Sequence, residues 1–166
     1  MNFKYFLNET TKPTIQPKTE DDLKDIIEDT IKEKGFNCDL NFIDTSKIKD
    51  MSGLFFSSEF NGDISKWDVS NVDDMEFTFS YSKFKGDISK WDVSNVKYMT
   101  SMFKGSKFNG DISKWDVSNV KGMDSMFTDS AFNGDISKWN VSNVEDMEYV
   151  FNRSPLEGNE PDWYKD

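Results

Sequence analysis

The stretch Gly62–Val72 reads GDISKWDVSNV, and it decides the fold because the same letters return at a fixed interval along the chain. They recur at 86–96 and 110–120, and once more at 134–144 with Asn140 in place of aspartate. The tryptophans that mark the register, at equal intervals, are Trp67, Trp91, Trp115 and Trp139. A fixed period of this length is typical of chains that stack one structural unit per repeat, since a single unit cannot bury its apolar face alone.

The repeat extends beyond these copies in a degraded form. A weak copy begins at Phe36, and Trp163 follows Trp139 at the same interval that separates the other tryptophans. Atypical end copies are expected in a stacked array because the outermost units face water. The sequence therefore predicts an extended segment over 1–18, a capping helix over 19–35, five 24-residue repeats over 36–155 with an atypical first copy, and a terminal half-repeat with an acidic tail over 156–166.

The apolar spacing within one copy predicts an α/β repeat. Its first apolar positions are Ile64, Trp67, Val69 and Val72. Alternation at Trp67 and Val69 indicates a short strand, while Val72, Met75 and Phe79 follow helical spacing and indicate a short helical turn. The side chains expected in the core are Trp67, Trp91, Trp115, Trp139, Met99, Phe103, Met123 and Phe127. The alternative for the tryptophans is an exposed aromatic strip that binds sugars.

A helix is expected before the repeats. Thr19 precedes three acidic residues, a pattern of N-terminal capping, and an apolar stripe with Leu23 and Ile27 follows. Lys34 and Gly35 end the pattern as a helix C-terminus does. We expect this stripe to cover the otherwise open core of the first repeat.

Composition excludes several classes of function. The chain has 20 basic and 31 acidic residues, so its net charge is 20 − 31 = −11, and it has no histidine and one cysteine. Catalysis by histidine, zinc sites made of cysteines and intrachain disulfides are excluded. No loop typical of nucleotide binding and no nucleophile motif is present. We expect no enzyme activity, no catalytic residue, no cofactor and no bound metal.

Charge and hydropathy also bear on partners and location. The acidic balance argues against direct binding of nucleic acid and favours a basic partner, including a protein that itself binds nucleic acid. No apolar run is long enough for a membrane span, and Met1–Thr14 lacks the apolar core of a signal peptide. We expect a cytoplasmic monomer, with exposure at the cell surface as the alternative.

Positions that differ between copies are the candidates for binding, because the core and turn residues are held while these change. The protein-binding candidates are Asp73, Asp74, Glu76, Phe77, Tyr81, Tyr98, Glu145, Asp146, Glu148 and Tyr149. Exposed aromatic residues among charges are the usual material of protein interfaces. The alternative is sequence drift on a solvated surface. For Phe77, a further alternative is that it fills the core in place of the neighbouring Thr78.

The phrase FNGDISKWDVSNV, followed by methionine and phenylalanine at fixed places, resembles the BspA-like leucine-rich repeat family of bacterial surface proteins. The resemblance covers about residues 36–163. It implies a right-handed leucine-rich-repeat-like β/α solenoid with an N-terminal capping helix, acting in contacts between proteins and often as a surface adhesin. Here tryptophan, isoleucine, valine, methionine and phenylalanine fill the places that leucine usually holds.

These observations favour a non-enzymatic protein-binding solenoid. We expect its acidic and aromatic variable surface to bind, and in one version to inhibit, a protein that handles nucleic acid or serves in defence. Bacterial or phage origin fits this interpretation. A surface adhesin domain and a structural spacer are the alternatives.

Overall fold

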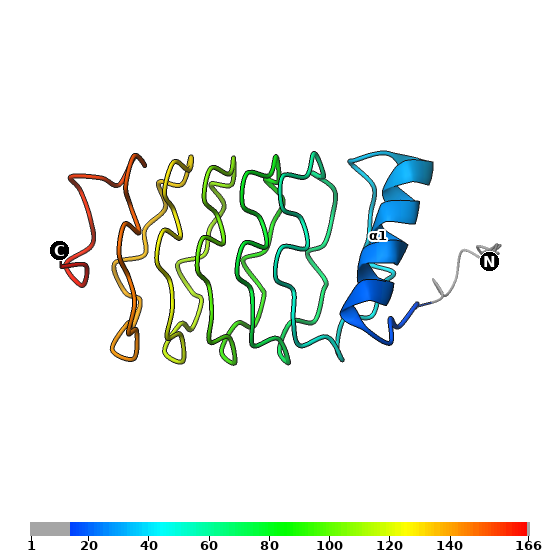
Figure 1. The fold of residues 1–166 in the computed structure, drawn as a ribbon, viewed down its shortest axis with the longest axis horizontal. Helices are drawn as coiled ribbons and strands as arrows, with labels where there is room; N and C mark the ends of the chain where they lie inside the picture. Colours follow the sequence, from blue (N-terminus) through cyan, green and yellow to red (C-terminus); the bar gives the residue numbers. More distant parts are fainter. Residues whose placement is uncertain (1–13, 166) are drawn as a thin grey trace.

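The chain forms a stack of similar coils with one helix at its N-terminal end (Figure 1). This is a computed structural model that describes residues 14–165. Helix α1, Glu20–Lys34, lies beside the first coil, and the chain then winds toward the C-terminus at the opposite end of the stack. We call one 24-residue turn of this stack a coil. The coils begin at Phe36, Phe60, Phe84, Phe108 and Phe132.

The helix has the ends that its sequence predicts. The Thr19 hydroxyl accepts a hydrogen bond from the Asp22 N–H at 3.1 Å, and the Gly35 N–H donates to the Ile31 carbonyl. Gly35 has a φ of 84°, which a residue with a side chain rarely adopts. The side chain of Leu23 is buried in the same core cluster as the first coil, so α1 covers that end of the stack.

Most of the extended segment expected over 1–18 lies outside the described residues. Its last part pairs with the first coil. The Ile15 N–H donates to the Phe42 carbonyl at 2.9 Å, and the Ile15 carbonyl accepts from the Asp44 N–H at 2.8 Å.

The expected fold class, an α/β repeat arranged as a right-handed leucine-rich-repeat-like β/α solenoid, is wrong. Within residues 14–165, α1 is the only helix and no segment forms a strand. Neighbouring coils are joined instead by isolated parallel bridges, one of which joins Asp74 to Tyr98. The architecture is therefore a stack of coils built from turns, closed at one end by a helix.

Turns replace the expected strand on the tryptophan side of each coil. The Trp67 N–H donates to the Ile64 carbonyl at 3.1 Å. The Val72 N–H likewise donates to the Val69 carbonyl at 2.9 Å. Apolar residues three positions apart therefore mark the two ends of a turn, and these side chains are still buried in the core.

The methionine side explains why the bridges do not merge into a sheet. The Met75 N–H donates to the Tyr98 carbonyl in the next coil at 2.9 Å, and the Phe77 N–H does the same to the Thr100 carbonyl at 3.0 Å. The Thr78 N–H that follows turns back to the Met75 carbonyl of its own coil. In a β-strand, the N–H groups between these would bond to the neighbour on the other side. Here they bond within their own coil, so no continuous ladder forms.

The tryptophans form a continuous ladder inside the stack. Trp67, Trp91, Trp115 and Trp139 are only 4–5% exposed. Each indole N–H donates to the carbonyl 27 residues earlier, as Trp115 does to Ile88 at 3.2 Å. The Trp67 and Trp91 rings are nearly parallel, with centroids 6.4 Å apart. The ladder therefore buries aromatic area and satisfies every buried indole N–H in it.

Two phenylalanine columns fill the rest of the core. Phe103 stacks on Phe127 of the next coil at 5.8 Å and on Phe108 at 4.5 Å. Met99 and Met123 belong to the same cluster and have no exposed surface. The core is thus one cluster that runs from α1 to the last coil.

Polar side chains hold the turns on the outside. The Asp63 carboxylate accepts the Ser65 N–H at 2.9 Å, and the equivalent aspartates of later coils do the same. The Asn95 amide donates to the Ser70 carbonyl of the preceding coil at 2.7 Å, in a contact that recurs in each repeat. Both residue types thus satisfy backbone groups that the turns leave open.

We expect Trp115→Ala to lower the free energy of unfolding by about 3–5 kcal/mol, because it opens a cavity in the middle of the stack. Trp163→Ala is the matched control, since Trp163 makes the same indole contact at the partly exposed end and should cost less. Urea unfolding followed by circular dichroism measures both. Equal losses for the two variants would contradict a ladder anchored in the middle of the core.

Candidate protein-interaction surface

The stacking of coils brings the ten candidate residues to one side of the molecule. Bridges join Asp74 to Tyr98, Tyr98 to Gly122, and Gly122 to Asp146, so these positions form one row across the stack. We call the surface made by this row and its neighbours the variable face. Its residues are Asp73, Asp74, Glu76, Phe77, Tyr81, Tyr98, Glu145, Asp146, Glu148 and Tyr149.

Four large aromatic side chains of the variable face are exposed. The exposed fractions are 41% for Phe77, 50% for Tyr81, 42% for Tyr98 and 60% for Tyr149. Phe77 does not replace Thr78 in the core, because Thr78 is itself buried and its hydroxyl donates to the Met51 and Met75 carbonyls. The face therefore presents aromatic area that the core does not use.

Phe56 extends this aromatic surface, although it is not among the ten residues that the sequence indicates. Its ring packs edge-on against Tyr81 with centroids 6.1 Å apart, and it is exposed. The signal was present in the pair Phe55-Phe56. Phe55 stands one repeat before Phe79 and occupies the core position, so its neighbour has to point elsewhere.

Glycines in the following coil make room for two of the tyrosines. A Cβ on Gly105 would lie 2.4 Å from the Tyr81 ring, which means that the ring rests directly on the Gly105 backbone. The Tyr98 ring lies over Gly122 in the same manner, at 3.8 Å from the place of such a Cβ. Both glycines follow their tyrosine by one repeat. The tyrosines are therefore supported by the stack and exposed on their other side.

Backbone conformation directs Phe77, Tyr81 and Tyr149 outward. All three have φ values of 56–58°, in the left-handed region that residues other than glycine seldom adopt. Ser101 and Ser125 occupy the position of Phe77 and Tyr149 in the middle coils with nearly the same φ. The turn geometry therefore imposes this conformation whatever the side chain, and the side chain remains free to vary.

Lysines of the middle coils neutralise part of the acidic charge. Lys97 pairs with Asp73 at 3.2 Å, and Lys121 pairs with Glu145 at 3.9 Å, each across neighbouring coils. Four other carboxylates of the variable face form no ion pair in the part of the chain that the structure describes. They belong to Asp74, Glu76, Asp146 and Glu148. These carboxylates give the face its unpaired negative charge.

Two of these carboxylates are held close to other acids. Burial raises the pKa of Glu76, and the charges of Asp74, Asp124 and Asp50 raise it further, against a hydrogen bond with Thr100 that lowers it. Burial likewise raises the pKa of Asp74, with Asp50 and Asp73 adding to the effect. The face thus concentrates negative charge where the coils bring carboxylates together.

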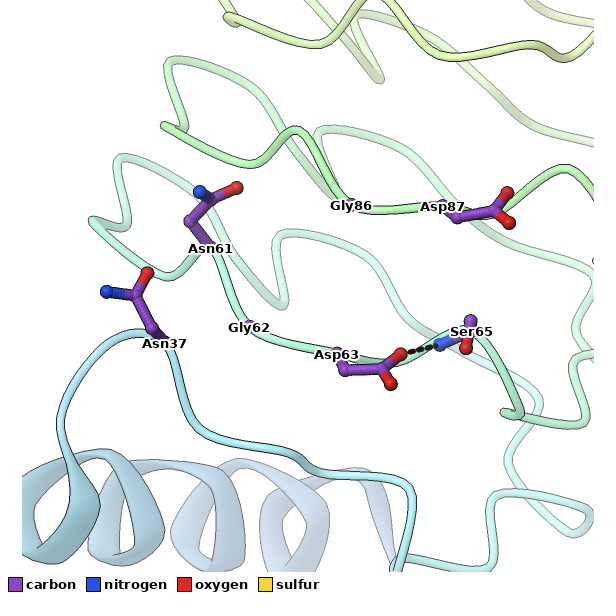
Figure 2. A pocket seen from close by; sticks show the side chains of 7 residues that line it. All are labelled: Asn37, Asn61, Gly62, Asp63, Ser65, Gly86 and Asp87. Carbon is purple, nitrogen blue, oxygen red and sulfur yellow. Dashed lines mark hydrogen bonds between the residues drawn. The ribbon is translucent and has the colours of Figure 1, made fainter.

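A shallow hollow of about 420 Å³ lies beside Gly62 and Gly86 of two neighbouring coils (Figure 2). Asn61, Asp63 and Asp87 line it, and Figure 2 shows the Asp63 carboxylate bonded to Ser65. Hydrogen bonds from Ser65 and Ser89 lower the pKa of Asp63 and Asp87, respectively. These carboxylates hold turns, and none of the candidate residues lies in the hollow.

Residues 14–165 contain no group of three or more metal-ligating side chains placed to hold an ion. Among the same residues, no helix combines the length and the apolar character that crossing a membrane requires.

Comparison with known proteins identifies a family. The model of the family described as "Mycoplasma protein of unknown function, DUF285" matches residues 22–129 and, in a second overlapping match, 81–163. No curated protein and no solved structure matches the chain.

We expect Glu76→Gln to raise the midpoint of thermal unfolding at pH 7. Because burial holds the pKa of Glu76 above its usual value, the ionised group destabilises the folded state at neutral pH. The gain should shrink as the pH falls through the raised pKa toward about 4, where the folded protein takes up that proton.

Glu148→Gln is the matched control for this measurement, since Glu148 holds the same coil position but is exposed. Melting curves at a series of pH values compare the two variants. A gain for Glu76→Gln that stays constant from neutral pH down to about pH 4 would contradict the stated origin of the effect.

Proposed function

We propose that this chain, which belongs to the DUF285 family of Mycoplasma proteins of unknown function, is a non-enzymatic protein that binds another protein through its variable face. The observation that carries the proposal is that the variable face exposes four large aromatic side chains among carboxylates that form no ion pair within residues 14–165. The likeness of its repeats to the BspA-like leucine-rich repeat family supports the same class of function.

The aromatic residues supply the binding energy in this proposal. Tyrosine and phenylalanine bury large areas in an interface and lose little conformational freedom. Tyr81 loses still less, because Gly105 supports its ring in the free protein. The backbone at Phe77 and Tyr149 is fixed by the left-handed turn in which each lies. The face is therefore preorganised for contact.

The charge of the face determines the kind of partner. Asp74, Glu76, Asp146 and Glu148 would meet basic side chains, and the net charge of −11 would speed the encounter. We infer that the partner is a basic protein such as one that handles nucleic acid, and that the bound chain blocks its basic site. A surface adhesin role is the second candidate, favoured by the repeat resemblance.

Variants taken from the chain's own repeats test the aromatic contact. Tyr98→Gly copies Gly122 and Tyr149→Ser copies Ser125, so each places a residue that the same coil position already tolerates. We expect the double variant to keep its melting temperature and to lose at least about tenfold in affinity for the partner, which is about 1.4 kcal/mol.

The partner is obtained by affinity capture from the native cell, identified by mass spectrometry and then titrated in purified form. Phe36→Ser is the control, because Phe36 is half-exposed but lies outside the variable face. Unchanged affinity of the double variant would remove the variable face as the binding site.

Salt separates the two candidate functions. Binding of a basic partner to unpaired carboxylates should weaken steeply as the salt concentration rises from about 0.1 M to about 1 M, because the screening length falls from about 10 Å to about 3 Å. Titrations of the captured partner at several salt concentrations measure this. Salt-independent binding to an extracellular matrix protein would favour the adhesin role and contradict a basic partner.

A further inference from the structure

No segment within residues 14–165 covers the methionine side of the last coil at the C-terminal edge of the stack. Val144 and Met147 belong to the core by their position in the repeat, but both are partly exposed. Their counterparts one coil earlier, Val120 and Met123, have no exposed surface. The difference arises because, among the described residues, no further coil covers this side.

The terminal half-repeat closes the rest of that end. The Trp163 indole donates to the Ile136 carbonyl at 2.9 Å and so continues the ladder. The Tyr164 ring packs edge-on against Phe151 at 5.1 Å. The Glu157 carboxylate accepts the Arg153 N–H at 3.0 Å and takes the place of a carbonyl from a next coil. Residues 144–149 have no such cover among the described residues.

Backbone groups at residues 144–149 lack the partners that they have in the coil before. There, the Met123 N–H donates to the Asp146 carbonyl at 2.9 Å and the Ser125 N–H to the Glu148 carbonyl at 2.8 Å. Within residues 14–165, the equivalent N–H groups of Met147 and Tyr149 make no hydrogen bond. The Glu145 carbonyl also accepts no hydrogen bond within these residues. One coil earlier, the equivalent carbonyl of Lys121 accepts the Glu145 N–H at 2.7 Å.

We propose that an extended, basic segment of a partner protein pairs with the edge formed by residues 144–149 and adds one more row to the stack. By the pattern of the inner coils, the segment runs parallel to this edge. One N–H of the segment donates to the Glu145 carbonyl, and its next carbonyls accept from Met147 and Tyr149. This is the addition of a chain to an exposed backbone edge.

The side chains at the edge define the sequence that the segment needs. Apolar residues three positions apart would cover Val144 and Met147, as each coil covers the one before it. The positions between them would face Glu145 and Asp146, which are exposed and acidic. Lysine fits there, because Lys121 already pairs with Glu145 from the other side. The recognised motif is therefore apolar, two basic or polar residues, and apolar.

A second copy of the chain does not fit this edge. Each edge offers the N–H groups of Met147 and Tyr149 against the carbonyl of Glu145, so two edges placed face to face leave donors without acceptors. They would also set the acidic side chains of one copy against those of the other. The opposite end of the stack is covered by α1, whose Leu23 and Ile27 are buried there. The edge thus fits a basic segment of another protein better than it fits a second copy.

This inference rests on the proposed function, since the segment belongs to the basic partner and reaches Tyr149 and Glu148 of the variable face. It is tested without that partner. The probe is a synthetic peptide with the sequence of Asn95–Met102, NVKYMTSM, which carries the motif in the register of an inner coil. The peptide is titrated into the full ¹⁵N-labelled chain up to about 1 mM. This concentration detects a binding free energy of about −4 kcal/mol.

We expect the amide resonances of Met147 and Tyr149 to shift on titration and their exchange with solvent to slow by at least about tenfold at saturation. A control peptide with glutamate in place of Lys97 should bind at least about tenfold more weakly, because it meets Glu145 and Asp146 with like charge. Phe36→Ser in the protein should leave the titration unchanged.

Two variants probe the edge itself. Met147→Lys and Val144→Lys place a charge where the segment must lay an apolar side chain, and partial exposure of both residues lets each variant fold. Either one should abolish the shifts. Shifts that persist in both folded variants, or no response of the Met147 and Tyr149 amides at about 1 mM peptide, would overturn edge pairing. Neither of these results tests the contact of Tyr98 with the partner. The double variant described above tests the proposed function separately.

Discussion

The hydrogen bond from each indole N–H to the carbonyl 27 residues earlier fixes how one coil lies on the next. A buried indole N–H without a partner would cost about 1–3 kcal/mol, so a coil that slipped by one residue would lose this contact along the whole stack. The same register that satisfies the tryptophans aligns equivalent residues of successive coils. The variable face exists only because that alignment is kept from Asp74 to Asp146.

Much of the interior could be predicted from the sequence, but the fold class could not. The repeat period places Trp67, Met99 and Phe103 inside, and the signals around Thr19 and Gly35 mark the ends of α1. Apolar residues three apart fit a helical turn, a leucine-rich repeat strand and a chain of turns equally well. The direction of each peptide group distinguishes these structures, and a pattern of side chains does not encode it.

The candidate surface shows a similar division. The residues that vary between copies gather on one side because stacking makes them neighbours, and this follows from the period alone. Three features needed the spatial arrangement: the packing of Phe56 on Tyr81, the support of Tyr81 by Gly105, and the pairing of Lys97 with Asp73. Each joins residues of adjacent coils. The period places Tyr81 beside Gly105 and Asp73 beside Lys97, but side-chain direction decides whether the two residues of a pair touch.

The N–H groups of Met75, Phe77, Phe79 and Tyr81 all point to the next coil, and this pattern, repeated in later coils, has an electrostatic consequence. The dipoles of these peptide groups add along the axis of the stack, as those of an α-helix do. The N–H groups of Asp73, Asp74 and Lys83 point to the preceding coil and offset part of this sum, so the end toward which the larger set points carries a small partial positive charge. That end is the last coil, and from Phe132 onward the chain holds eight acidic and three basic residues, 3 − 8 = −5. The Glu157 carboxylate already binds one N–H at this end. The positive pole of the stack is thus matched by the chain's own acidic residues.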